Sequence, residues 1–160
     1  MTAGDLEVTG ADGNTAVAHH QAGDVEYVPR SPTSRRRGTS KEAARSVVVQ
    51  LEEASLPALA NPTGLPDAFD RPSIQKALDN ERVTAWRYTW QFGKRTPLHF
   101  HARDVVVVYL ADGVLKSTTP DGKSVLNPHS FGLTKFSPRG RIHYEELVEG
   151  QASAVMVELK

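Results

Sequence analysis

The stretch GKRTPLHFHARDVVVVYLADG, residues 93–113, decides the fold. Its later part, Val105–Leu110, is apolar throughout and rich in valine, which predicts a strand covered on both faces. His99 and His101 lie two residues apart, so on a strand both imidazoles project to the same face. The pair is compatible with half of a metal site and with two polar residues on a strand that leads into the core.

The residues around this stretch predict further strands. The alternating segment Val83–Trp90 places Trp86, Tyr88 and Trp90 on one face. Turn signals at residues 112–113 and 120–122 separate short strands, with 116–119 and 123–127 forming a hairpin and 154–159 a last strand. Prolines make residues 56–70 an irregular connector, and residues 72–79 have room for at most two helical turns. The pattern predicts an all-β sandwich or barrel.

The N-terminal residues repeat part of this pattern. When the chain is shifted by 109 positions, Gly4–Gly13 aligns with Gly113–Gly122, and His20 meets His129 without a gap. Residues 4–51 therefore predict a second copy of the C-terminal half of the domain, and chance similarity between hairpins is the alternative. We expect a partial, degenerate unit at 1–52 and a complete domain at 53–160. A half-barrel exposes strand edges, so we expect it to dock on the complete domain or to form a homodimer.

Composition excludes several classes of partner. The 160 residues include 19 basic and 19 acidic side chains, 39% apolar residues and no cysteine. This balance gives no reason to expect nucleic acid, and Arg35–Arg37 lacks the interleaved aromatic residues of a nucleic-acid surface and is predicted to be a solvated turn. No apolar run is long enough to span a membrane, and the N-terminus does not resemble a signal peptide, so a cytoplasmic location is expected by default.

A second histidine motif follows at Gly132–Leu147, GLTKFSPRGRIHYEEL, with Pro138, Gly140 and His143 at fixed spacing. Together the two stretches resemble the paired motifs of the cupin superfamily, G-x5-H-x-H-x3,4-E-x6-G and G-x5-P-x-G-x2-H-x3-N. The resemblance covers about residues 80–160. It implies an antiparallel jelly-roll β-barrel. With the N-terminal repeat at residues 4–51, the chain resembles a bicupin whose first half is truncated.

The resemblance also implies the metal ligands. In cupins the histidine pair, the glutamate and the later histidine bind one metal ion. The resemblance therefore implies that His99, His101 and His143 are the metal ligands here. Val106 stands at the glutamate position and Leu147 at the asparagine position. Three neutral imidazoles suit a divalent metal, Fe²⁺ if the protein is an enzyme and otherwise Zn²⁺, Ni²⁺ or Cu²⁺, and leave coordination positions open. Vestigial histidines in a degenerate cupin are the alternative.

Other candidate residues come from the same comparison. Asp104, close to the vacant glutamate position, is interpreted as a turn residue or an acceptor for an imidazole N–H rather than a ligand. Arg87 and Tyr144 are the other catalytic candidates, and with Arg103 they are candidates to anchor an anionic small molecule. Trp86, Tyr88 and Trp90 are interpreted as the lining of a pocket for a planar substrate or as part of the core or of an interface. Val106, Val108 and Leu110 on one strand face predict a largely apolar cavity, which suits a small organic ligand.

The first copy is not expected to bind the same metal. Ser34 stands where the second copy has His143, no His-x-His precedes it, and His19 and His20 are interpreted as surface residues.

Three functions remain open from the sequence. Characterised three-histidine cupins include non-heme iron dioxygenases acting on β-diketones and thiols, so the resemblance implies a dioxygenase of a small carbonyl compound. A non-catalytic binding or sensor module is the second. The third is a metal-independent isomerase or epimerase with a histidine base and a tyrosine acid.

Overall fold

The computed structural model describes residues 2–29, 35–41, 43–52 and 56–160, which form twelve β-strands and no helix. The chain divides into two units, residues 1–49 and 50–160. The expected domain boundary after residue 52 adjoins residues 53–55, which lie outside the described ranges.

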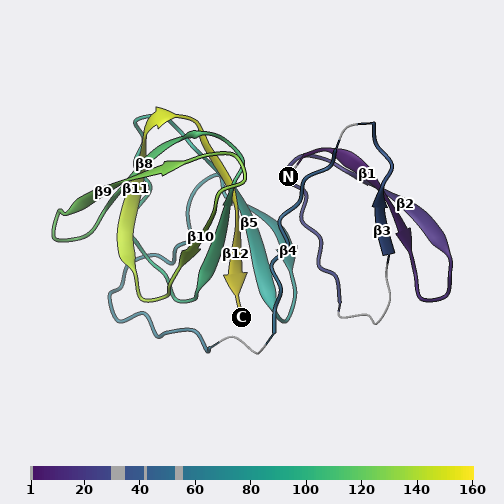
Figure 1. The fold of residues 1–160 in the computed structure, drawn as a ribbon. Helices are drawn as coiled ribbons and strands as arrows, with labels where there is room; N and C mark the ends of the chain where they lie inside the picture. The colour runs from purple at the N-terminus through teal and green to yellow at the C-terminus, as the bar shows by residue number, and fades with distance from the viewer. Residues whose placement is uncertain (1, 30–34, 42, 53–55) are drawn as a thin grey trace. The chain divides into compact units, whose positions relative to one another are not determined.

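The second unit is built from two antiparallel sheets, which Figure 1 shows facing one another. A five-stranded sheet has the order β10-β7-β12-β5-β4, and a four-stranded sheet has the order β6-β11-β8-β9. The strands are β4 (Gln75–Asp79), β5 (Val83–Trp90), β6 (His99–Phe100), β7 (Val105–Tyr109), β8 (Gly113–Thr118), β9 (Ser124–His129), β10 (Thr134–Ser137), β11 (Ile142–Gly150) and β12 (Ala152–Leu159). This arrangement confirms the expected all-β jelly-roll barrel.

Strand β5 has the predicted bounds, and its aromatic face lines the barrel core. In the five-stranded sheet Trp86 is in register with Met156 and Val107, and Tyr88 with Ala154 and Tyr109. All of these side chains belong to one buried cluster or pack against it. The aromatic triplet thus faces inward.

Strand β7 presents the opposite face from the one expected to line the cavity. The core takes its side chains from Val105, Val107 and Tyr109, not from Val106, Val108 and Leu110. A strand's side chains alternate, and the pairing of β7 with β12 fixes which set is inside. A run of four valines offers no sequence contrast between the two faces, which explains the error.

The expected helical turns at residues 72–79 are wrong, because Gln75–Asp79 form strand β4 against β5. Ser73 has a φ of 66°, in the left-handed region that a right-handed helix does not contain. The free edge of β5 supplies the backbone partners that the segment needs. The predicted hairpin is confirmed and is longer than expected, with β8 and β9 joined at Gly122, whose φ is 81°.

The first unit contains a three-stranded sheet of order β2-β1-β3, formed by β1 (Gly4–Thr9), β2 (Thr15–His20) and β3 (Arg35–Gly38). The three arginines expected in a solvated turn lie on β3, where Arg36 pairs with Glu26 at 3.0 Å and Arg37 with Glu7 at 3.1 Å. Ser34 lies outside the described residues. The docking of this unit, or its pairing in a homodimer, stays a prediction.

Candidate metal centre

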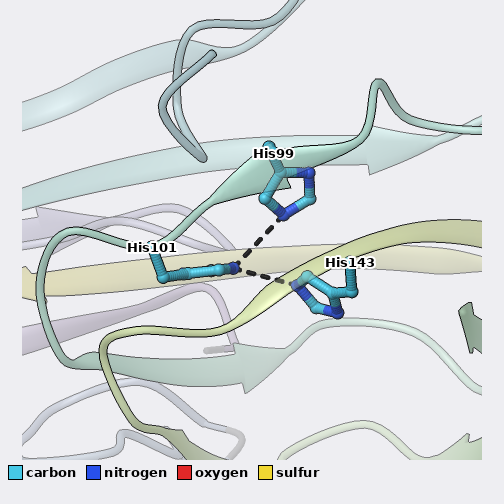
Figure 2. Close-up of side chains that lie close together, drawn as sticks. All are labelled: His99, His101 and His143. Atoms are coloured by element: carbon cyan, nitrogen blue, oxygen red, sulfur yellow. Dashed lines mark hydrogen bonds between the residues drawn. The ribbon is translucent and has the colours of Figure 1, made fainter. Parts of the chain in front are cut away.

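Two neighbouring strands bring the three histidines together. Strand β6 pairs with β11 so that His99 stands opposite His143. His101 follows β6 at the same side-chain parity as His99, and its backbone N–H donates to the Arg141 carbonyl at 2.9 Å. The three rings therefore converge from two segments that lie more than 40 residues apart in the chain (Figure 2).

The ring nitrogens have the spacing of ligands to one metal ion. Nε2 of His101 lies 3.2 Å from Nε2 of His99 and 2.9 Å from Nε2 of His143. Metal–imidazole bonds of about 2.0–2.1 Å put two nitrogens of one site about 2.9–3.4 Å apart for bond angles of about 90–110°. One ligand atom from each of the three residues lies within 4.8 Å of the others. The donor set fits a divalent metal held by three imidazoles.

Burial keeps these imidazoles neutral. His99, His101 and His143 are 2%, 7% and 3% exposed. Desolvation lowers the pKa of His99, and for His101 desolvation and the two neighbouring rings lower the pKa to about 2. Desolvation, followed by His99 and Arg141, also lowers the pKa of His143 to about 2. Neutral rings keep the lone pairs that a metal requires.

Hydrogen bonds at the far nitrogens orient two of the rings. Nδ1 of His99 donates to the Pro97 carbonyl at 2.8 Å, which leaves its Nε2 as a bare acceptor. Nδ1 of His143 lies 2.7 Å from Ser117 Oγ, which can accept the proton that ligation through Nε2 places there. Arg141 Nη2 lies 3.2 Å from the same nitrogen. Nδ1 of His101 is buried with no hydrogen-bond partner.

No carboxylate replaces the missing cupin glutamate among the clustered ligands, because the group of possible ligands in the described residues consists of the three histidines. Val105, one position before the residue assigned to the glutamate position, points into the core and is 1% exposed. Leu147, at the asparagine position, is also buried in that core. Glu145 lies two residues after His143 on β11. Its negative charge opposes the lowering of the pKa of His99 and His101.

The three proposed catalytic candidates lie outside the histidine cluster. Asp104 accepts the Arg139 backbone N–H at 2.8 Å, so its carboxylate ties two loops together. Arg87 follows Trp86 on β5 and therefore projects to the opposite face from the aromatic triplet. Tyr144 alternates with His143 on β11, and the Arg95 guanidinium lies 5.1 Å from its ring. Nothing brings these three side chains to one point with the rings.

Aromatic side chains stand beside the cluster. Phe69 stacks on Trp86 with ring centroids 5.2 Å apart and meets His101 edge-on at 6.3 Å. Trp90 Nε1 donates to Glu145 Oε2 at 3.1 Å. Aromatic rings thus lie beside the histidine cluster and along the inward face of β5, where Tyr88 and Trp90 meet edge-on with an interplanar angle of 82°.

Arg71 is a buried residue of this region that the sequence did not indicate. It precedes Pro72 in an irregular connector, and its side chain is 4% exposed. Burial lowers the pKa of Arg71, and the Glu145 carboxylate opposes that shift. No motif marks the position, because only the folded path of the connector carries Arg71 into the barrel.

Comparison with solved structures gives the class of the second unit. A cupin domain from Bordetella pertussis Tohama I is 28% identical, with a TM-score of 0.50 over 60% of this chain and 96% of that chain. A cupin from Methanocaldococcus jannaschii with a double-stranded β-helix fold is 14% identical (TM-score 0.46, 69% and 93% covered), and the polyketide cyclase RemF from Streptomyces resistomycificus is 18% identical (0.45, 69% and 80%). The sequence matches no family model and no curated protein.

The fold, the motif spacing and the Bordetella structure together support the resemblance of the chain to the cupin superfamily. Its histidine cluster fits a metal-binding cupin. Within the described residues no helix is long and apolar enough to cross a membrane.

Proposed function

We propose that this protein is a cupin metalloenzyme that holds one divalent metal ion through His99, His101 and His143. The observation that carries the proposal is the convergence of three buried Nε2 atoms at 2.9–3.2 Å. His99 Nε2 can only accept, and His101 Nε2, which faces both other rings, has at most one proton to share between them. Hydrogen bonds within the cluster therefore satisfy the buried nitrogens incompletely. A cation among them satisfies the lone pairs.

We propose further that the reaction is the oxygen-dependent cleavage of a small β-dicarbonyl compound, with iron(II) as the metal. Bound iron supplies redox chemistry with dioxygen and polarises a carbonyl. The chain supplies neutral ligands, and their lack of a carboxylate leaves a site that favours an enolate anion. The Phe69–Trp86 stack provides a wall for a planar substrate and limits the access of water.

The cluster is poorly suited to metal-independent isomerisation. A histidine base works best when its pKa lies near the working pH. The pKa values of His101 and His143 lie at about 2, so these rings are weak bases at neutral pH. This difference favours the metalloenzyme over the isomerase or epimerase.

The test is oxygen uptake by the full chain purified without chelator and reconstituted with iron(II). With 2,4-pentanedione we expect one dioxygen consumed per molecule cleaved, with both oxygen atoms retained in the products. His101→Ala should abolish iron binding and uptake, whereas His19→Ala, an exposed histidine bonded to Asp5, should change neither. Stoichiometric metal without turnover would leave the binding or sensor module, and wild-type protein that binds no metal would overturn the proposal.

A further inference from the structure

Arg71 is a buried cation whose hydrogen-bonding capacity is largely unused. Its Nε and Nη1 atoms are buried, and neither has a hydrogen-bond partner in the part of the chain that the structure describes. Among the described residues, the partner of its Nη2 atom is the Met156 sulfur, at 3.5 Å, and a thioether is a weak acceptor. Glu145 Oε2 lies 3.9 Å from Nη1, near enough for attraction but too far for a hydrogen bond. Burying a guanidinium in this state is costly, and a ligand that accepts its protons would offset the cost.

Aromatic rings hold this guanidinium in place. Its central carbon lies 4.1 Å from the centroid of the Tyr88 ring and 5.6 Å from that of Trp90. A cation this close to aromatic rings is attracted by them, and the attraction does not use the N–H donors of the guanidinium, which remain available to a ligand. Tyr88 and Trp90 lie on the inward face of β5, so the donors are presented inside the barrel.

The same interior contains the histidine cluster. Glu145, the neighbour of Arg71, lies on the same face of β11 as His143. Its backbone N–H donates to Thr96 Oγ1 at 2.8 Å, on the segment that leads to His99. Glu145 thus links the guanidinium of Arg71 to the strand that carries His143.

We propose that Arg71 binds the carboxylate group of the small-molecule ligand, while the carbonyl end of that ligand lies at the three histidines. The inference rests on the proposed function and deepens it by naming the substrate class, an oxo-carboxylate. Arg71 and a divalent metal would together carry three positive charges, of which Glu145 offsets one, so an anionic ligand is favoured. The Glu145 carboxylate at 3.9 Å favours a carboxylate over the more highly charged phosphate.

Two probes differ in the group that Arg71 would recognise. 2,4-Dioxopentanoate and 2,4-pentanedione share the β-diketone, and the first carries a carboxylate where the second has a methyl group. In ¹⁵N-labelled full-length protein loaded with zinc, we expect saturable movement of the Arg71 Nε–H resonance with the acid. The diketone should leave that resonance unmoved. If neither compound moves it, the inference is overturned.

Calorimetry of variants gives a second readout. Arg71→Lys keeps the charge but loses the planar donor set, so the acid should bind about tenfold more weakly or worse. Binding of the diketone and of zinc should stay within about twofold of wild type, because neither uses Arg71. Arg95→Lys is the matched control, since Arg95 is exposed and pairs with Glu146 at 3.2 Å. Equal weakening of both probes, or an unchanged preference for the acid, would contradict the assignment.

The two proposals fail in different ways. If wild-type protein binds neither zinc nor iron(II), the metal function fails, and the metal-free protein still tests Arg71. There, movement of the Nε–H resonance with 2,4-dioxopentanoate supports the carboxylate site, and its absence overturns it. If zinc binds to wild type and to Arg71→Lys alike while the acid is not preferred by either, only the Arg71 inference fails.

Discussion

The sheet β2-β1-β3 of the first unit and the strands β9-β8-β11 of the second have the same register. Adding 109 to each residue number converts one set of pairs into the other: Leu6 stands opposite Ala18 and Gly38, and Leu115 stands opposite Asn127 and Leu147. The turns agree as well, since Gly13 and Gly122 have φ values of 78° and 81°. These correspondences support the repeat proposed from the sequence.

The two sheets differ in what covers them. Leu115 is 1% exposed and belongs to the barrel core, whereas every residue of β1 is half-buried. Ser117, beside His143, corresponds to Val8 in the first sheet. Turn residues and strand pairing thus suffice for the local geometry, and the histidine cluster needs in addition strand β6, which places His99 opposite His143.

The largest difference should appear in core truncations at equivalent positions. Leu115→Ala should lower the free energy of unfolding of the second unit by about 2–5 kcal/mol, because it leaves a cavity in a packed core. Leu6→Ala, at a half-buried site, should cost about 1 kcal/mol or less in its own unit. Urea denaturation followed by tryptophan fluorescence for the second unit, and hydrogen exchange for the first, measures both. Equal costs would show that the first sheet has a core of its own.

The free energy of unfolding should depend on pH mainly in the second unit, which contains the histidine cluster. Its histidines have lowered pKa values in the folded state, about 2 for His101 and His143. Below about pH 6.5 the unfolded chain therefore binds more protons than the folded one, and metal-free stability falls as the pH falls, by up to about 1.4 kcal/mol per pH unit for each ring.

Urea midpoints in the presence of chelator between pH 8 and pH 5 test this expectation. Removing one ring in His143→Ala should flatten the slope, whereas His19→Ala should not. A wild-type midpoint for the second unit that is the same at pH 7 and pH 5 would contradict the buried, neutral state of the cluster.

Replacing Ser117 with valine, the residue at the equivalent position of the first sheet, should have a smaller effect, on metal affinity. Ser117→Val introduces the side chain found at Val8 and removes the acceptor for the His143 Nδ1 proton. Loss of such a partner weakens metal affinity by about tenfold. Competition with a coloured zinc chelator measures the change, with Ser117→Thr as the variant that retains a hydroxyl. An unchanged affinity in Ser117→Val would leave Ser117 without a role in the site.

Substitutions of the turn glycines should have the smallest effects on stability, and the effects should be the same in the two sheets. Gly13→Ala and Gly122→Ala each place a Cβ at positive φ, which should cost about 1 kcal/mol in the unit concerned. Nothing lies within 4 Å of the added Cβ at either position, so the backbone conformation alone sets the cost. Thermal unfolding that differs greatly between the two variants would break the equivalence of the hairpins.

Local patterns in the sequence predicted much of this fold. Alternation gave the bounds of β5, and the turn at residues 120–122 gave the β8–β9 hairpin. The spacing of His99, His101 and His143 anticipated their convergence, because strand parity and motif register fix where such side chains point. These features depend on neighbours along the chain or on a motif.

Features that depend on distant contacts were not predictable. Strand β4 forms because β5 has a free edge, and the inward face of β7 is set by its pairing with β12. Arg71 carries no motif, and only the folded path of the connector brings it beside Glu145 on β11. The candidates Asp104, Arg87 and Tyr144 were selected by residue type, and the pleat of their strands or a loop contact turned them away from the rings.

Metal stoichiometry tests the central claim most directly. Full-length protein stripped with chelator, reloaded with a divalent metal and freed of excess should contain one metal ion per chain by plasma mass spectrometry. His99→Ala, His101→Ala and His143→Ala should each reduce this content severely, while His19→Ala retains it. Metal-free wild-type protein, or the same content in the wild type and in all three variants of the cluster, would contradict the account.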